Sequence, residues 1–148
     1  MEQMQDPFKL DRFVQAQEPI YPRVVEELRR GCKTGHWMWF IFPQLKGLGR
    51  SATTEWYGIA SLAEAKAYLQ HPTLGARLIE CTSLVNGIAA RSATEIFGGI
   101  DCLKFRSSMT LFAEATAQDQ VFREALSKYF QGEPDRLTLE MLQAHGAA

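Results

Sequence analysis

Apolar residues recur along the chain at the three- and four-residue spacing of amphipathic helices. Ser61 and Ser92 are each followed three residues later by glutamate, which is the capping-box pattern of a helix start. Proline follows Asp6 and Tyr21 at the expected start of two earlier helices, and Gly31 ends the second of them. Further helices are predicted after Pro72, from caps at Asp101 and Asp119, and over residues 137–142. No sustained alternation of apolar and polar residues predicts a strand, so we expect an all-α fold of about eight short helices around one core.

The most unusual segment is the aromatic run His36–Gln44, which holds two Trp and two Phe in nine residues. We interpret its centre as a short buried helix or an extended plug, because a lone strand would have no partner. Trp37, Phe40 and Ile41 are spaced i, i+3 and i+4, the spacing of a helix face that packs into a core. We therefore expect these three side chains to anchor the run in the interior.

Trp39 would then point in a different direction, with polar residues at both ends of the run. His36 precedes it and Gln44 follows it. A second aromatic direction flanked by polar groups is typical of a pocket that stacks a planar ring. His36, Trp39 and Gln44 are therefore candidate pocket residues.

Composition and charge exclude several classes of protein. The 148 residues carry a net charge of -1, so no overall positive field would attract nucleic acid. The longest nearly uncharged apolar stretch is far shorter than the ~20 residues of a membrane span. Three scattered cysteines and an acidic N-terminus without a signal-peptide pattern favour the cytoplasm. We expect one domain over residues 1–148, with flexible ends at 1–6 and 144–148.

Charge is nevertheless unevenly distributed. Residues 28–54 contain no acidic side chain and five permanent cations: Arg29, Arg30, Lys33, Lys46 and Arg50. Within this stretch, Gly47, Gly49, Arg50 and Ser51 form a turn that leads into a predicted helix. Glycines before a helix start allow backbone amides to converge on an anion. The spacing is neither that of a P-loop nor that of a dinucleotide-binding fingerprint, however, and a simple tight turn with solvated Lys46 and Arg50 is the favoured alternative.

Asp101, Lys104 and Ser108 lie along one face of a predicted helix. An acid, a cation and a hydroxyl in line could position a substrate, although a capping aspartate with an ordinary ion pair is the simpler alternative. The three histidines show no i, i+4 pairing, so we expect no metal site. Nothing in the sequence indicates a cofactor.

Across nearly its whole length the chain resembles the bacterial domain-of-unknown-function family 1810. The motifs that carry the resemblance are Arg12–Phe13, Ala16–Gln17, Gly35–Gln44, Gly47–Ser51, His71–Pro72, Leu74–Gly75, Arg77–Leu78, Ile96–Gly98 with Asp101, and Lys104–Phe112. The resemblance implies an all-α fold and supplies no activity. A more distant similarity, in length and in Phe97-Gly98 near Asp101, is to the helical NADAR group. That group acts on N-glycosidic bonds of ADP-ribose-type compounds.

Two functions follow as hypotheses. In the first, the protein binds or processes an anionic nucleotide-like or ADP-ribose-like molecule, and if it is an enzyme, N-glycosidic cleavage is the first reaction to expect. Trp39 would stack on the ring, cations and the Gly47–Ser51 turn would hold phosphates, and Asp101 and His36 are the catalytic candidates. In the second, the aromatic and basic surface is a non-enzymatic site for a protein partner or for a second copy. The oligomeric state stays open.

Overall fold

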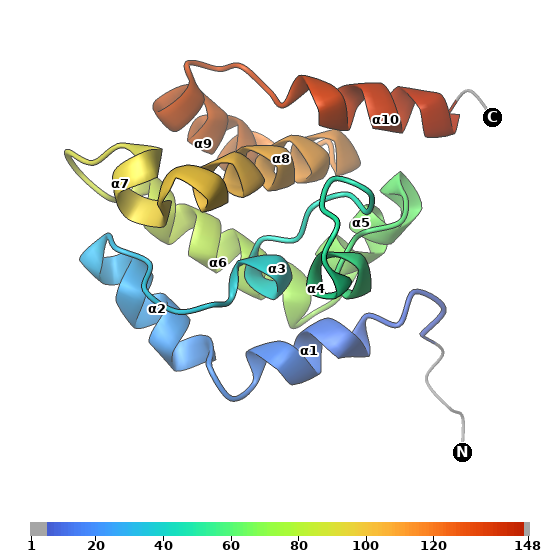
Figure 1. Cartoon of the computed structure of the whole chain (residues 1–148), viewed down its shortest axis with the longest axis horizontal. Coiled ribbons are helices and arrows are strands. Elements are labelled where there is room, and N and C mark those ends of the chain that lie inside the picture. Colours follow the sequence, from blue (N-terminus) through green and yellow to red (C-terminus); the bar gives the residue numbers. More distant parts are fainter. Residues whose placement is uncertain (1–5, 147–148) are drawn as a thin grey trace.

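The computed structural model describes residues 6–146, and the described part contains ten helices, so the expected number of about eight is too low. The all-α class itself is confirmed. In chain order the helices are α1 (Asp11–Gln17), α2 (Tyr21–Arg30), α3 (Met38–Ile41), α4 (Ala52–Trp56), α5 (Leu62–Gln70), α6 (Leu74–Asn86), α7 (Ala93–Phe97), α8 (Gly99–Ala115), α9 (Gln120–Phe130) and α10 (Arg136–Gly146). Figure 1 shows α1 and α2 along one edge and α9 and α10 along the opposite edge.

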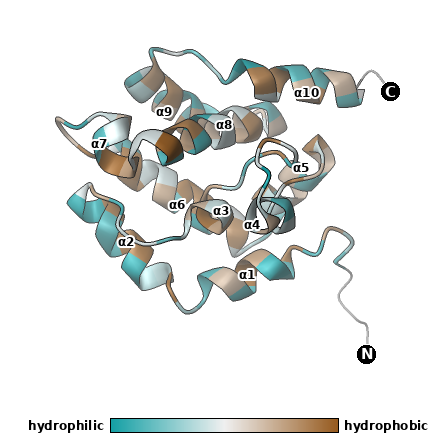
Figure 2. Ribbon diagram, viewed as in Figure 1, coloured by the Kyte–Doolittle hydropathy of each residue, from teal (hydrophilic) through white to brown (hydrophobic). Residues whose placement is uncertain are grey.

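Helix α8 is the central element. It packs against α5, α7, α9 and α10, and its Phe105, Met109 and Phe112 are fully buried. Hydrophilic residues colour much of α2 in Figure 2, whereas hydrophobic and neutral residues prevail along α6 and α8. Buried apolar residues from nearly every helix form one cluster around α8. A helix that is enclosed on most sides needs apolar residues around most of its circumference, which explains this composition.

The aromatic run forms the short helix α3, as one of the two predicted alternatives requires. Trp37 and Ile41 are buried as expected, but Phe40 is only half-buried. Met38 and Phe42 are buried in its place. The helix ends after four residues, and Phe42 leaves the helical backbone with φ -124° and ψ 72°. The helical spacing therefore does not continue to the end of the run, and the predicted face was partly wrong.

The capping predictions differ in outcome. The capping box at Ser92 is confirmed, because Ser92 and Glu95 each bind the other's backbone amide. Ser61 likewise accepts from the amide of Glu64, but the Glu64 carboxylate accepts from Ala60. At Ser61, therefore, the serine half of the capping box forms, whereas Glu64 binds the Ala60 amide instead of the Ser61 amide.

Two predicted helix starts were wrong, and a third was right in position but lacks the expected side-chain bond. Helix α1 begins at Asp11, and the Asp6 carboxylate accepts from the amides of Leu10 and Asp11 instead of starting a helix at once. Asp101 lies in the first turn of α8, whose N-cap is Gly98. Asp119 is the N-cap of α9 but makes no side-chain capping bond.

The predicted flexible ends fall mostly outside the structure. Residues 1–5 and 147–148 lie outside the described part, and residues 144–146 belong to α10. No helix between residues 6 and 146 has the length and apolar character needed to cross a bilayer.

Candidate functional site

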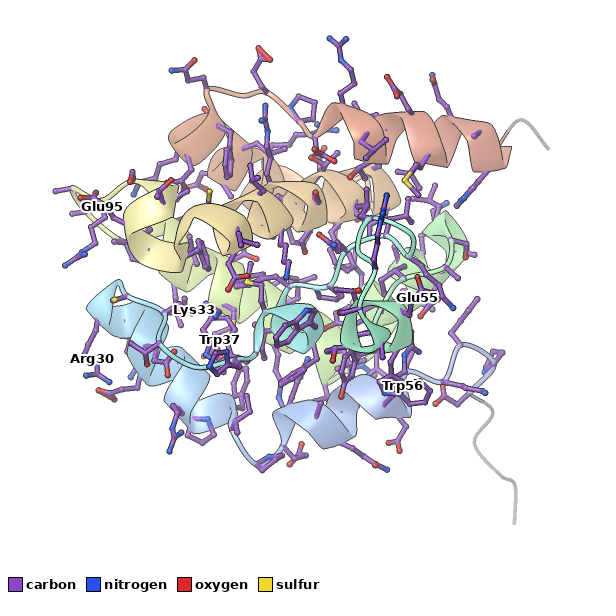
Figure 3. The ribbon with its side chains drawn as sticks, in the orientation of Figure 1. Arg30, Lys33, Trp37, Glu55, Trp56 and Glu95 are labelled. Carbon is purple, nitrogen blue, oxygen red and sulfur yellow. The ribbon has the colours of Figure 1, made fainter. Side chains whose placement is uncertain are left out.

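An open groove of about 510 Å³ lies between the segment that leads into α3 and the junction of α7 and α8. We call it the α8 groove, and its lining residues are Lys33, His36, Trp39, Phe97, Gly98, Gly99, Ile100 and Asp101. Four predicted site residues meet there, three from residues 33–39 and the fourth from the first turn of α8. Figure 3 shows Lys33 beside Trp37 next to α2 and α3, well away from Trp56 in that view.

Lys33 is the enclosed cation of the groove. Its ammonium group pairs with the Asp101 carboxylate at 2.8 Å and donates to the carbonyl oxygen of Gly35 at 2.6 Å. It also lies 5.1 Å from the centre of the Trp37 ring, and its side chain is 8% exposed. An ammonium group held on three sides is a fixed part of the site, because moving it would break all of these contacts.

Lys104 is held less firmly. Its ammonium nitrogen lies 3.8 Å from the Asp101 carboxylate and 5.1 Å from the centre of the Trp39 ring, and its side chain is 22% exposed. The two lysines and Asp101 together leave one positive charge beside the groove. Lys104 is the cation that can turn toward an incoming anion, because its one ion pair is long and partly solvated.

Trp39 brings an unused donor to the same place. Its ring is partly exposed, yet the indole nitrogen is inaccessible to water and has no hydrogen-bond partner among residues 6–146. A buried N–H group without an acceptor is uncommon in native proteins and calls for an explanation. An acceptor on a ligand could reach this nitrogen only if neighbouring atoms moved, because the nitrogen has no accessible surface.

The junction of α7 and α8 exposes backbone to the groove. Gly98 has φ +88° and ψ 165°, a conformation that only glycine adopts readily. The first bond into α8 runs from the Cys102 amide to the Gly98 carbonyl, so the amides of Gly99, Ile100 and Asp101 precede the helical pattern. A Cβ at Gly98 or Gly99 would meet no atom within 4 Å. These amides have no bonding partner in the part of the chain that the structure describes, and together with the helix dipole they make this end of α8 attractive to negative charge.

Comparison with known proteins places the chain in a family. The model of a family described as "Protein of unknown function (DUF1810)" matches residues 7–142. The chain belongs to the DUF1810 family. The resemblance inferred from the sequence is thereby confirmed. DUF1810 carries no activity in its description, and no curated protein matches the chain.

A solved structure has the same fold as this DUF1810 protein. It is the crystal structure of the conserved hypothetical protein Rv1873 from Mycobacterium tuberculosis, which is 60% identical in sequence. The TM-score is 0.93, and the match covers 93% of this chain and 99% of that one. The description of Rv1873 names no function, so the site of this DUF1810 chain has to be argued from its own geometry.

The predicted phosphate turn does not join the groove of this DUF1810 chain. Ser51 caps α4 by accepting from the Thr54 amide, and a Cβ at Gly49 would stand 2.7 Å from Thr54. Gly47 packs against Met141 of α10. Local packing thus accounts for both glycines and the serine, which agrees with the simple-turn alternative. The neighbouring cations are exposed, namely Lys46, which lines a separate hollow, and Arg50.

Two further candidates also lie outside the groove. The Gln44 carbonyl accepts from the Ile59 amide, next to the isolated bridge between Leu45 and Ile59. Ser108 is fully buried, and its hydroxyl has no partner in the described part of the chain. Of the predicted line Asp101, Lys104 and Ser108, only the first two approach each other and the groove.

Sequence reasoning missed the apolar and backbone side of the groove, formed by Phe97, Gly98, Gly99 and Ile100. A signal was available, because the adjacent glycines Gly98 and Gly99 stand between two predicted helical segments. Ile100 is 75% exposed and adds apolar surface to the edge of the groove.

Proposed function

We propose that the α8 groove binds a small anionic molecule with a planar ring, of nucleotide or ADP-ribose type. The observation that carries the proposal is the convergence on one open groove of Lys33, His36 and Trp39 from one segment with Asp101 from a distant helix. Local structure alone does not require this set of side chains to meet. A groove with an aromatic wall and a few converging polar groups is typical of a ligand site.

Charge favours the N-terminal end of α8 as the place for the anionic group. The amides of Gly99 and Ile100 are available there, and the helix dipole adds to their attraction. Lys104 lies one turn further along and can leave its long contact with Asp101 to meet the anion. Lys33 remains on Asp101, so the carboxylate keeps a counter-ion after Lys104 has moved.

The ring of the ligand belongs against Trp39. Lys104 now covers this ring at 5.1 Å, and its movement toward the anion would free the aromatic face. A base stacked there would lie over the face of the partly exposed Trp39 ring. Ile100 supplies exposed apolar surface at the edge of the same groove.

The reaction that we assign to this arrangement is hydrolysis of an N-glycosidic bond. Water attacks the anomeric carbon as the carbon–nitrogen bond breaks, and the electron pair of that bond passes to the ring nitrogen. Asp101 stabilises the positive charge that develops on the sugar and accepts the proton of the attacking water. His36, at the exposed edge of the groove, donates a proton to the leaving nitrogen. Proton exchange with solvent then returns Asp101 and His36 to their starting protonation states.

Calorimetric titration with ADP-ribose, AMP and adenosine tests the binding step. We expect ADP-ribose and AMP to bind more tightly than uncharged adenosine. Replacing Trp39 by alanine should weaken binding about tenfold, since stacking contributes ~1–3 kcal/mol per base. The matched control is Trp56→Ala, because Trp56 is 55% exposed and does not line the groove. Equal losses in both variants, or no binding by the unaltered protein, would contradict the proposal.

Turnover and self-association are followed in the same samples. The assigned reaction is supported if the unaltered protein releases free base and the Asp101→Asn variant binds the ligand but releases none. The exposed Ile100 is also the observation that favours the second candidate, an interaction module. The alternative would replace the proposed function if the protein binds no nucleotide and light scattering shows concentration-dependent association. That association should be lost in Ile100→Ser.

A further inference from the structure

A buried carboxylate outside the groove, Glu27 of α2, holds the loop that carries Lys33 and His36. The Glu27 side-chain oxygen Oε1 accepts from the amides of Thr34 at 2.8 Å and Gly35 at 2.9 Å. The same oxygen accepts from the Trp37 indole nitrogen at 2.9 Å. Three donors from one loop therefore converge on a single atom that belongs to another element.

The contacts continue from this carboxylate to the groove. Gly35 donates its amide to Glu27 and accepts at its carbonyl from the Lys33 ammonium group. Lys33 in turn pairs with Asp101 at 2.8 Å. There is no room for a side chain at Gly35, since a Cβ there would stand 2.8 Å from the Trp37 ring. The contacts from Glu27 to Asp101 thus run through the backbone of Gly35 and the enclosed ammonium group of Lys33.

Local stability does not explain a glutamate at this position. Glu27 lies on the buried stripe of α2 between Val24 and Leu28 and is only 2% exposed. It belongs to the C-terminal half of the helix, where the dipole disfavours negative charge. No Lys or Arg of residues 6–146 forms an ion pair with it. A buried charge is costly, and here only the three loop donors compensate it.

The protonation of Glu27 agrees with this geometry. Burial alone would raise the pKa of its carboxyl group. The hydrogen bonds from Gly35, Thr34 and Trp37 outweigh burial and hold that pKa below its ordinary value. The carboxylate is therefore charged at neutral pH and able to accept all three bonds.

We infer that Glu27 is a positioning residue of the α8 groove, which fixes Lys33 through Gly35 and thereby orients Asp101. The inference rests on the proposed function only for its effect on ligand binding. The geometry of Lys33 and Asp101 can be tested without any ligand. Glu27 itself is not among the residues that line the groove.

The direct test is proton exchange of the Lys33 ammonium group, measured by NMR in the ligand-free protein. Glu27→Gln keeps the size of the side chain but turns an amide group toward the loop donors. We expect the Lys33 ammonium protons to exchange with water about fivefold faster or more in this variant, because coupled contacts loosen together. ADP-ribose affinity should fall by a similar factor.

Glu64→Gln is the matched control. Glu64 is a second buried glutamate, 3% exposed, that accepts from a loop amide and pairs with Arg12. This variant should lose stability while the Lys33 exchange rate stays at its original value. Trp37→Phe removes one of the three donors without removing the charge. It should shift the exchange rate in the same direction by a smaller factor.

Unchanged Lys33 exchange in Glu27→Gln would overturn the inference, even if the variant binds ADP-ribose normally and the proposed function stands. Equal acceleration in the Glu64 variant would overturn it as well, since it would show a general loss of stability. If the unaltered protein does not bind ADP-ribose, the exchange rates of the three variants still decide the role of Glu27.

Discussion

Single buried polar residues fix the irregular segments around α3. Glu27 holds the loop before that helix, and Arg12 holds the segment after α4. The Arg12 guanidinium donates to the backbone carbonyls of Trp56 and Gly58 and pairs with Glu64 at 2.8 Å. Neither role can be read from helical spacing, because the Glu27 carboxylate binds a loop beyond its own helix and Arg12 binds residues more than forty positions away. Glu27 does leave one trace in the sequence, a charge on an otherwise apolar helix face.

Arg12→Met should lower the free energy of unfolding by about 3 kcal/mol or more, because it leaves a buried carboxylate without its partner. The side chains of Arg12 and Glu64 are only 9% and 4% exposed. Urea denaturation followed by circular dichroism measures the change. Arg123→Met is the control, since Arg123 is 46% exposed in its pairs with Glu114 and Asp119 and should lose less than ~1 kcal/mol. Similar losses in both variants would refute the structural role of Arg12.

At the scale of elements, helix starts with local chemistry could be predicted and long-range packing could not. The boxes at Ser61 and Ser92 depend on residues three positions apart, so their helices were found correctly. The start of α8 was missed because its cap is Gly98, whose backbone conformation leaves no motif. Phe42 was missed as a core residue because it packs edge-on against Phe105, more than sixty residues later in the chain.

The α7–α8 junction allows a matched test of backbone strain. Gly98→Ala should destabilise the protein by ~1–3 kcal/mol, because Gly98 has a positive φ that an alanine adopts only under strain. Gly99→Ala should be neutral or slightly stabilising, by ~0.4–1 kcal/mol, because Gly99 already belongs to the helix. A Cβ has free space at both sites, so only the backbone differs. Thermal unfolding checks the pair, and equal effects would contradict this account.

For the whole molecule, the sequence indicated the all-α class and the family, but it could not show which of its candidate residues meet. Lys33, Trp39 and Asp101 converge because α7 and α8 return to the segment before α3. The Gly47–Ser51 turn packs instead on α10 and on the start of α4. Tertiary packing, which sequence spacing does not encode, made this selection.

The central claim is that the α8 groove binds a ring-bearing anion, and an NMR titration with ADP-ribose tests it most directly. A base that stacks on Trp39 would change the surroundings of its indole N–H, so the signal of that group should shift strongly. We predict that the largest shifts fall on this signal and on the amides of Gly99 and Ile100, while the Trp56 indole stays unchanged. No shift at saturating ADP-ribose, or shifts centred on Trp56, would contradict the account.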